Sequence, residues 1–510
     1  MNSVIYTLAT RGLQADLITI EVENYRSNPG FVVVGLGDTA VQESRERVRA
    51  AIKNSNYSFP RGKVVVNLAP ADIHKAGPCF DLPIAIGLIA LANDLEFPHL
   101  DQTILLGELA LDGSLRHIDG ILGLTASAAE MGFQRIIVPE VNAEEAALIA
   151  DIQVIAGRSL QHVIDQLFEE DPERVQTREL HSLLNTKEAP LVDFGAVKGQ
   201  VHAKRGLEIA AAGSHNIIMN GSPGSGKTML AKAFKGILPP MNLDETLEVT
   251  KLYSLSGLLP EKTSLIHSRP FRTVHHTASG AALVGGGRVP KPGEISLAHR
   301  GVLFLDEMNE FSPYILDLLR QPLEDREITI SRTQGSLTYP AQFILCGATN
   351  PCPCGYYQIT NTRRECVCTP GTIARYQAKL SGPLLDRIDL YCHVSPVKAQ
   401  DLQEKQDGER SAEILKRVQT ARQIQFSRFK GSKTCVNSEM STEEIIRHCK
   451  PSVELNQLLQ QAIERLNLSA RSYHRVLKVS RTIADLAGRE EISTDDAMEA
   501  LQYRRKEPRK

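Results

Sequence analysis

The chain has 510 residues, of which 42% are hydrophobic and 23% charged, and its net charge is −2. The length suits about three to four domains, and the charge excludes a protein that binds nucleic acid through a globally basic surface. The longest apolar run, residues 82–92, is too short to span a membrane. The N-terminus lacks the basic region and cleavage site of a signal peptide. We therefore expect a cytoplasmic protein without membrane contact.

Residues 1–170 are predicted to form a compact α/β domain. The runs "GFVVVGL", "GKVVVNL", "QRIIVP" and "IQVIAG" indicate buried strands, and residues 39–55 have the spacing of an amphipathic helix. The next stretch, 171–190, is polar and charged, which is typical of a linker. A second α/β unit is predicted over 191–397, and a helix-rich tail with two capping-box patterns over 398–510.

The strongest motif lies in "NIIMNGSPGSGKTMLAKAF", where a short apolar strand leads into a glycine-rich loop and a helix. Backbone N–H groups of such a loop surround phosphate oxygens, a lysine reaches the β and γ phosphates, and a hydroxyl contacts Mg²⁺. The sequence thus predicts an ATP and Mg²⁺ site formed by Gly221, Ser222, Pro223, Gly224, Ser225, Gly226, Lys227 and Thr228.

Four later residues complete a hydrolysis site in this prediction. A buried strand ends in Asp306, expected to hold Mg²⁺, and Glu307, expected to polarise the attacking water. Another apolar strand ends in Asn350, which is placed to sense the γ-phosphate. Arg387 follows a short helix and is a candidate to complete the site of a neighbouring subunit, although a surface ion pair is an open alternative.

This order of motifs, followed by a helical tail, resembles the AAA+ ATPases, and in particular the clade of magnesium-chelatase motor subunits and MCM helicases. The resemblance implies a P-loop ATPase core with a helical lid, a β-hairpin before the sensor strand with Gln334-Gly335 at its turn, and a second sensor at Arg471.

The segments "FRTVHHTASGAALVGGG", "PKPGEISLAHRGVLFLDE", "LRQPLEDREITISR", "TNPCPCGYY" and "SGPLLDRIDL" resemble the ComM/YifB family of magnesium-chelatase-like proteins over nearly the whole chain. This resemblance implies a bacterial homo-hexameric helicase that drives branch migration of incoming DNA during natural transformation. Its implied partners are single-stranded and branched DNA and recombination proteins.

The N-terminal domain resembles the proteolytic domain of Lon-type (S5-like) proteases, and the corresponding ChlI domain, in "HKAGPCFDLPIAIGLIALAND" and the later "LDGSLRHIDGILGL". A serine–lysine dyad needs a hydroxyl and an amine in contact. Cys79 stands at the position of the serine and Leu122 at that of the lysine. Because an aliphatic side chain cannot accept a proton, we expect this domain to be catalytically dead.

Four of the nine cysteines form two Cys-x-Cys pairs separated by eleven residues, after the sensor strand. Four thiolates suit a tetrahedral Zn²⁺, although Cys-x-Cys is tighter than the usual structural spacing, and four reduced thiols in a loop are the alternative. The predicted zinc ligands are Cys352, Cys354, Cys366 and Cys368.

Between residues 261 and 300 there are six Lys or Arg against two acids. In a ring motor such an insertion would contact DNA phosphates, and the predicted contacts are Arg288, Lys291 and, on the hairpin, Arg332. A basic loop that only contacts a neighbouring subunit is the alternative. Three rival functions remain at this point: an ATPase that remodels a protein partner without DNA, an ATP-regulated protease, and a scaffold that uses ATP only for assembly.

Overall fold

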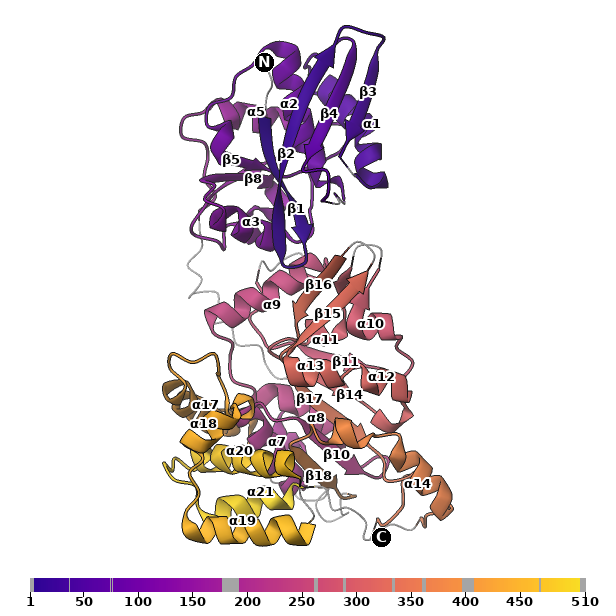
Figure 1. Ribbon diagram of the computed structural model, residues 1–510, viewed down its shortest axis with the longest axis vertical. Coiled ribbons are helices and arrows are strands. Elements are labelled where there is room, and N and C mark those ends of the chain that lie inside the picture. The colour runs from indigo at the N-terminus through magenta and orange to yellow at the C-terminus, as the bar shows by residue number, and fades with distance from the viewer. Residues whose placement is uncertain are drawn as a thin grey trace.

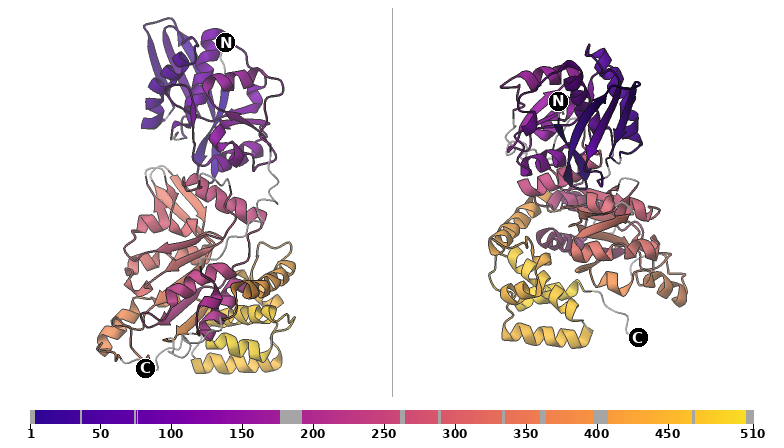
Figure 2. Two further views of the ribbon diagram at one scale, coloured as in Figure 1. Left: turned by 180° about the vertical axis from the view of Figure 1, so that it is seen from behind. Right: turned by 45° about the horizontal axis from the view of Figure 1, so that its top comes forward.

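The protein is elongated, with the N-terminal α/β unit at one end, the second α/β unit, which is the predicted ATPase core, in the middle and the helical tail beside the core at the other end (Figures 1 and 2). The computed structural model describes residues 4–35, 37–73, 75, 77–176, 192–260, 265–287, 290–332, 335–359, 364–396, 408–466 and 469–504. The predicted linker falls mostly on 177–191, outside the described residues, and so do Arg288 and Gln334.

The N-terminal unit is built on a seven-stranded mixed sheet in which only β1 with β2, and β2 with β4, run antiparallel. In spatial order its strands are β3 (Gly30–Val34), β4 (Lys63–Ala69), β2 (Gln14–Tyr25), β1 (Val4–Arg11), β5 (Thr103–Leu105), β8 (Arg135–Pro139) and β9 (Gln153–Gly157). The four strands and the helix predicted from sequence are all present. A small hairpin, β6 (Glu108–Leu109) and β7 (Leu115–Arg116), lies apart from the sheet.

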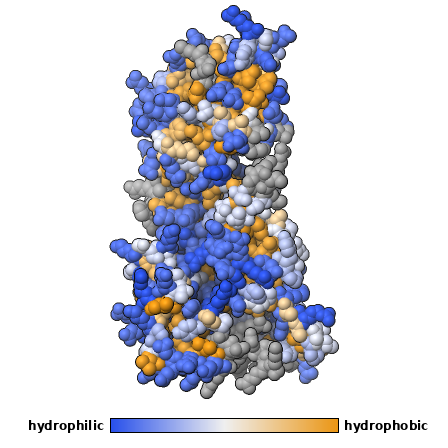
Figure 3. Space-filling view, in the orientation of Figure 1, coloured by the Kyte–Doolittle hydropathy of each residue, from blue (hydrophilic) through white to orange (hydrophobic). Residues whose placement is uncertain are grey.

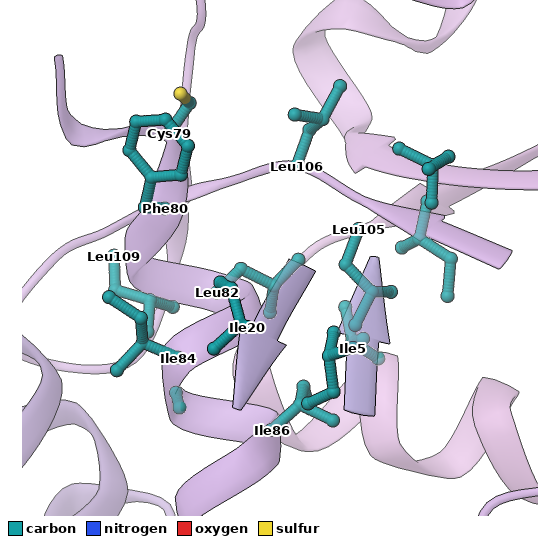
Figure 4. Close-up of a cluster of buried hydrophobic side chains, with 14 of the residues drawn as sticks. Ile5, Ile20, Cys79, Phe80, Leu82, Ile84, Ile86, Leu105, Leu106 and Leu109 are labelled. Atoms are coloured by element: carbon teal, nitrogen blue, oxygen red, sulfur yellow. The ribbon is translucent and has the colours of Figure 1, made fainter. Parts of the chain in front are cut away.

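Five helices pack with this sheet around one hydrophobic core, part of which Figure 4 shows. They are α1 (Thr39–Asn54), α2 (Asp81–Asn93), α3 (Ile121–Glu130), α4 (Glu140–Ala146) and α5 (Leu160–Phe168). Helix α2 is apolar on almost all sides and buried from Asp81 to Ala90, as expected for a helix that is enclosed by the sheet and other helices.

The ATPase core has a five-stranded parallel sheet. Its spatial order is β11 (Phe271–Val274), β14 (Val302–Leu305), β17 (Ile344–Thr349), β10 (Ile217–Gly221) and β18 (Leu390–Val394). Strand β14 is fully buried, which agrees with its continuous apolar sequence. Since the strands are parallel, the residues that follow β10, β14 and β17 meet at one edge, where a ligand site is expected.

The helices of the core and its two inserted hairpins surround this sheet (Figure 1). The helices are α7 (Val201–Gly213), α8 (Lys227–Phe234), α9 (Leu243–Leu255), α10 (Gly280–Val284), α11 (Glu294–Leu297), α12 (Pro313–Asp317), α13 (Arg320–Asp325), α14 (Pro370–Ala378) and α15 (Gly382–Leu385). The hairpins are β12 (Gly285–Gly286) with β13 (Lys291–Pro292), and β15 (Glu327–Arg332) with β16 (Gly335–Pro340).

The tail consists of α17 (Ser411–Arg428), α18 (Thr442–His448), α19 (Val453–Leu466), α20 (Ala470–Leu486) and α21 (Thr494–Gln502). Capping boxes start α18 and α21, as predicted. The apolar faces of these helices join the core around β10 and β18 in one continuous hydrophobic cluster. Among the described residues no helix is both long and apolar enough to cross a membrane.

The N-terminal unit contacts the ATPase core where α3 meets α9. Leu122, Leu148 and Leu265 form a small buried apolar cluster across this contact. Beside it the buried Glu145 accepts hydrogen bonds from the Leu122 N–H, at 3.1 Å, and from the Ser254 hydroxyl. Leu122, which replaces the expected dyad lysine, therefore belongs to an interface between the two units.

Candidate active site

The glycine-rich loop joins β10 to α8, which begins at Lys227. The Lys227 ammonium donates to the Gly221 and Ser222 carbonyls, at 2.7 and 2.9 Å, and to Asn350 Oδ1 at 3.1 Å. Burial lowers the pKa of Lys227 to about 8, against the effect of the nearby Asp306 carboxylate. The lysine thus keeps its charge at neutral pH and lies within reach of the predicted sensor.

The residues predicted to bind magnesium come together at this edge of the sheet. The Thr228 hydroxyl donates to Asp306 Oδ2 at 2.8 Å, and Asp306 directly follows β14. A hydroxyl and a carboxylate that converge on one point are the oxygen ligands that Mg²⁺ takes beside a nucleotide, with water and phosphate oxygens filling its other positions. This pair therefore fits a magnesium ion bound together with ATP.

Glu307 has a left-handed backbone conformation, with φ of 50°, and its side chain is about half exposed. Its carboxylate lies 4.0 Å from the Nδ1 atom of His276. The sequence interpretation gave His276 no role, because the contact depends on which strands are neighbours. Val274 pairs with Leu305, and this register brings the two residues that follow β11 beside the two acids that follow β14.

Arg387 and Arg471 lie together, at the other edge of the sheet. The Asn216 side chain, directly before β10, donates to the Arg387 carbonyl at 3.0 Å. Gly221, where the phosphate loop starts, is five residues further along β10, which is about 16 Å in a strand. Arg387 and Arg471 both pair with Glu324 instead. Within one chain these arginines thus face away from the phosphate loop.

The four cysteines of the predicted clip converge. Their sulfur atoms all lie within 4.8 Å of one another, and the contacts of Cys352 with Cys354 and Cys366 measure 3.3 and 3.7 Å. Four thiolates about 2.3 Å from a zinc ion have sulfurs about 3.8 Å apart. Burial opposes ionisation of Cys354, but hydrogen bonds from the Tyr356 N–H and from Cys352 lower its pKa to about 6. The convergence of the four sulfur atoms fits Zn²⁺.

The cysteine loop packs against the phosphate loop. Gly355, with φ of 84°, is so close to Pro223 that a β-carbon at this glycine would lie 2.3 Å from the Pro223 ring. The Pro351 carbonyl also accepts a hydrogen bond from Gln377 on α14 at 2.9 Å. A metal clip at this place would hold a loop of low apolar content against the back of the nucleotide site.

Cys79 lies at the start of α2, beside Phe80 and above apolar side chains such as Leu82 and Ile84 (Figure 4). Burial and the neighbouring Asp81 carboxylate raise the pKa of the Cys79 thiol to about 12. A thiol that stays protonated at neutral pH is a poor nucleophile. That the N-terminal unit is catalytically dead stays a prediction.

In the folded protein, acidic residues from other segments offset part of the positive charge of the basic insertion. Arg269 pairs with Glu245 at 2.7 Å, and Arg300 pairs with Glu248 at 2.8 Å, both acids lying outside the insertion. Lys291, one of the predicted DNA contacts, is 3.1 Å from Asp119 of the N-terminal unit. Pairs that are distant in the sequence thus offset several of these cations. For Arg332 the structure describes the strand position but not the side chain.

Three family models match the chain in succession. Residues 20–142 match "Subunit ChlI of Mg-chelatase", residues 193–402 match "Magnesium chelatase, subunit ChlI", and residues 408–504 match "Magnesium chelatase, subunit ChlI C-terminal". The phosphate loop, both acids, Asn350, the cysteine clip and Arg387 lie within the second match.

Several full-length relatives are similar to the chain. Competence protein ComM of Haemophilus influenzae is 43% identical over 506 residues, which cover 98% of this chain and 97% of that protein. The uncharacterized protein YifB of Escherichia coli is 42% identical over 510 residues, with coverage of 98% and 97%. The uncharacterized protein Rv2897c of Mycobacterium tuberculosis is 39% identical over 502 residues, with 98% of each chain covered. The fold, the three matches and these identities show that the chain belongs to the ComM/YifB family of magnesium-chelatase-like proteins, with an AAA+ core.

Proposed function

We propose that this protein is an ATP-driven motor that assembles as a homo-hexameric ring and moves branched DNA during recombination of incoming DNA. The observation that carries the ring is the position of Arg387 and Arg471 at the edge of the sheet opposite the phosphate loop. A nucleotide bound at Lys227 lacks these cations in its own chain and gains them from a neighbouring copy.

Hydrolysis in this proposal follows from four side chains around the phosphates. Lys227 neutralises charge on the β and γ phosphates, and Thr228 and Asp306 hold Mg²⁺ between them. Glu307 orients water toward the γ-phosphate, with His276 beside it. Arginines from the next subunit stabilise the charge of the transition state. A role with incoming DNA is supported by the similarity to the Haemophilus relative, which is named a competence protein.

DNA would contact the insertion and the hairpin β15–β16 near Arg288, Lys291 and Arg332. Neutralising all three should weaken DNA binding and reduce its dependence on salt, because each lost phosphate contact lowers the salt slope by about one. Hydrolysis without DNA should persist. The decisive measurement is the ATPase rate with no DNA, single strands, duplex and branched DNA, together with unwinding of the branched substrate.

A matched control replaces three exposed cations at the far end of the N-terminal unit: Lys53, Arg61 and Lys63. This variant loses the same charge and should bind DNA like the wild type. If the insertion variant also binds and unwinds branched DNA like the wild type, the assignment of these contacts is wrong.

A second candidate function is an ATPase that remodels a protein partner without DNA. It is favoured by the ion pairs that offset cations of the insertion, and by similarity to the magnesium-chelatase 38 kDa subunit of Cereibacter sphaeroides, 27% identical over 174 residues. An ATPase rate that no form of DNA changes would support this candidate over the DNA motor.

A further inference from the structure

Two arginines share the Glu324 carboxylate at the edge of the sheet where the chain would meet its neighbour. Arg387 donates to Glu324 Oε2, and Arg471 lies 3.7 Å from Glu324 Oε1. Arg320 and Arg475 are close enough that, together with burial and Arg471, they lower the pKa of the Arg387 guanidinium. Arg320 and Arg475 each have an acid of their own, Asp317 and Asp389. Glu324 is the counter-ion that Arg387 and Arg471 share, and without it these two cations would need another anion.

The arginine cluster is incompletely satisfied by protein groups. The Nε atoms of Arg387 and Arg320 are buried and have no hydrogen-bond partner among the described residues. The Arg387 side chain is only 14% exposed, whereas that of Glu324 is 51% exposed. A half-exposed carboxylate can leave at low cost, since exposed ion pairs contribute at most about 1 kcal/mol. The largely buried Arg387 stays in place for another anion, with the exposed Arg471 beside it.

We propose that Glu324 is an internal counter-ion that occupies the arginine site of the isolated chain and is displaced by the terminal phosphate of a nucleotide on the neighbouring copy. This inference rests on the proposed ring, in which Arg387 and Arg471 act on that phosphate. Glu324 is then a positioning residue that keeps the two arginines away from a partner until ring assembly brings a stronger anion.

The position of Glu324 in the chain also links this site to the hairpin that is proposed to contact DNA. Glu324 lies on α13, one residue before its end, and β15 begins at Glu327. The Arg326 N–H donates to the Pro322 carbonyl at 3.0 Å, and the Ala341 N–H donates to the Arg326 carbonyl at 2.8 Å. Both ends of the hairpin are thus fixed to the helix that carries Glu324, so that a shift of the hairpin would move its carboxylate.

Glu324→Gln tests the inference, because it keeps the shape of the side chain and removes its charge. Without DNA, hydrolysis per chain at limiting protein concentration should rise roughly two- to fivefold, the range that loss of one exposed ion pair supports. Half-maximal activity should need less protein, because a larger fraction of chains would present free arginines. Any stimulation by DNA should shrink by the same factor. Glu324→Asp, which keeps the charge, should stay nearer to the wild type.

The matched control is Asp317→Asn, since Asp317 is similarly exposed at 47% and pairs with Arg320 of the same cluster, at 2.7 Å. It should leave hydrolysis unchanged. Glu324→Gln activity equal to the wild type, or abolished, would overturn the inference. Mixing Arg387→Ala with Lys227→Ala chains distinguishes failure of the counter-ion inference from failure of the proposed ring. If mixing restores activity but Glu324→Gln hydrolyses ATP like the wild type, only the counter-ion role of Glu324 is refuted. If mixing restores no activity, the role of the arginines in the ring is refuted, and the inference about Glu324 with it.

Discussion

Asp389 connects the ATPase core to the helical tail, and replacing it by asparagine should loosen this connection. Asp389 lies directly before β18, and its carboxylate accepts from Arg475 of α20 at 2.6 Å and contacts His215, ahead of β10, at 3.2 Å. The opposite nitrogen of His215 contacts the Thr482 hydroxyl, also on α20, at 2.8 Å. Asp389→Asn keeps the shape of the side chain and removes the charge that Arg475 faces.

The expected cost follows from burial. The side chain of Asp389 is 7% exposed and that of Arg475 is 22% exposed, so that water replaces the lost partner only in part. Removing one partner of a buried ion pair costs about 3–5 kcal/mol, against 0–1 kcal/mol for an exposed pair. Because asparagine still accepts one hydrogen bond, we expect the lower end, about 3 kcal/mol, which is on the order of a 10²-fold change in an opening equilibrium.

Hydrogen exchange of the α20 amides, followed by mass spectrometry, measures this opening directly. The exposed residue Asp151 in the N-terminal unit provides a charge-matched control, Asp151→Asn.

Burial alone would raise the pKa of Asp389, but Arg475 and His215 outweigh burial and hold the pKa below its ordinary range. The stabilisation is therefore present above about pH 4 and lost as pH falls further, so the difference from wild type should persist at pH 5–7. Exchange of α20 within threefold of wild type at pH 7 would refute this reasoning.

Three further predictions concern the nucleotide site and the clip. Glu307→Gln should bind ATP and assemble but lose turnover by a factor on the order of 10² or more, and near-normal phosphate release by that variant would remove Glu307 from its role. Arg387→Ala and Lys227→Ala chains should regain ATPase activity when mixed, because mixed interfaces contain one intact site; mixed rings without activity would contradict this. Purified protein should contain about one zinc per chain by elemental analysis, with Cys352→Ser/Cys366→Ser losing it and binding ATP more weakly through the adjoining phosphate loop. Fully active metal-free protein would speak against the clip.

The sequence by itself determined the local chemistry of the nucleotide site. Strand, loop and helix around Lys227 are contiguous in the chain, and the glycines and the lysine act within a few residues of one another. The two acids after the continuous apolar strand β14 were equally readable, because a fully buried strand has a sequence signature of its own. The family resemblance, carried by long segments, is confirmed by the full-length relatives.

Only the tertiary structure decided which residues meet across the sheets and between the units. His276 lies beside Glu307 because β11 is the neighbour of β14, and strand order is not written in local periodicity. The same holds for Asp119, which pairs with Lys291 from 172 residues away and reduces a positive charge that the sequence alone overstates. Glu324 is another such residue, since it contacts Arg387 of the core and Arg471 of the tail, 63 and 147 positions away in the sequence.

The physical reason for this division is the distance along the sequence between the residues that interact. Helix capping, strand burial and the phosphate loop depend on interactions within about one turn or one strand, which propensity and pattern encode directly. Charge compensation and catalytic partnership depend on contacts between distant segments, where a small change in register would pair different side chains. The motifs and the family resemblance thus predicted the kind of machine, whereas the packing of α9, α13 and α20 decided which of its charged groups form ion pairs.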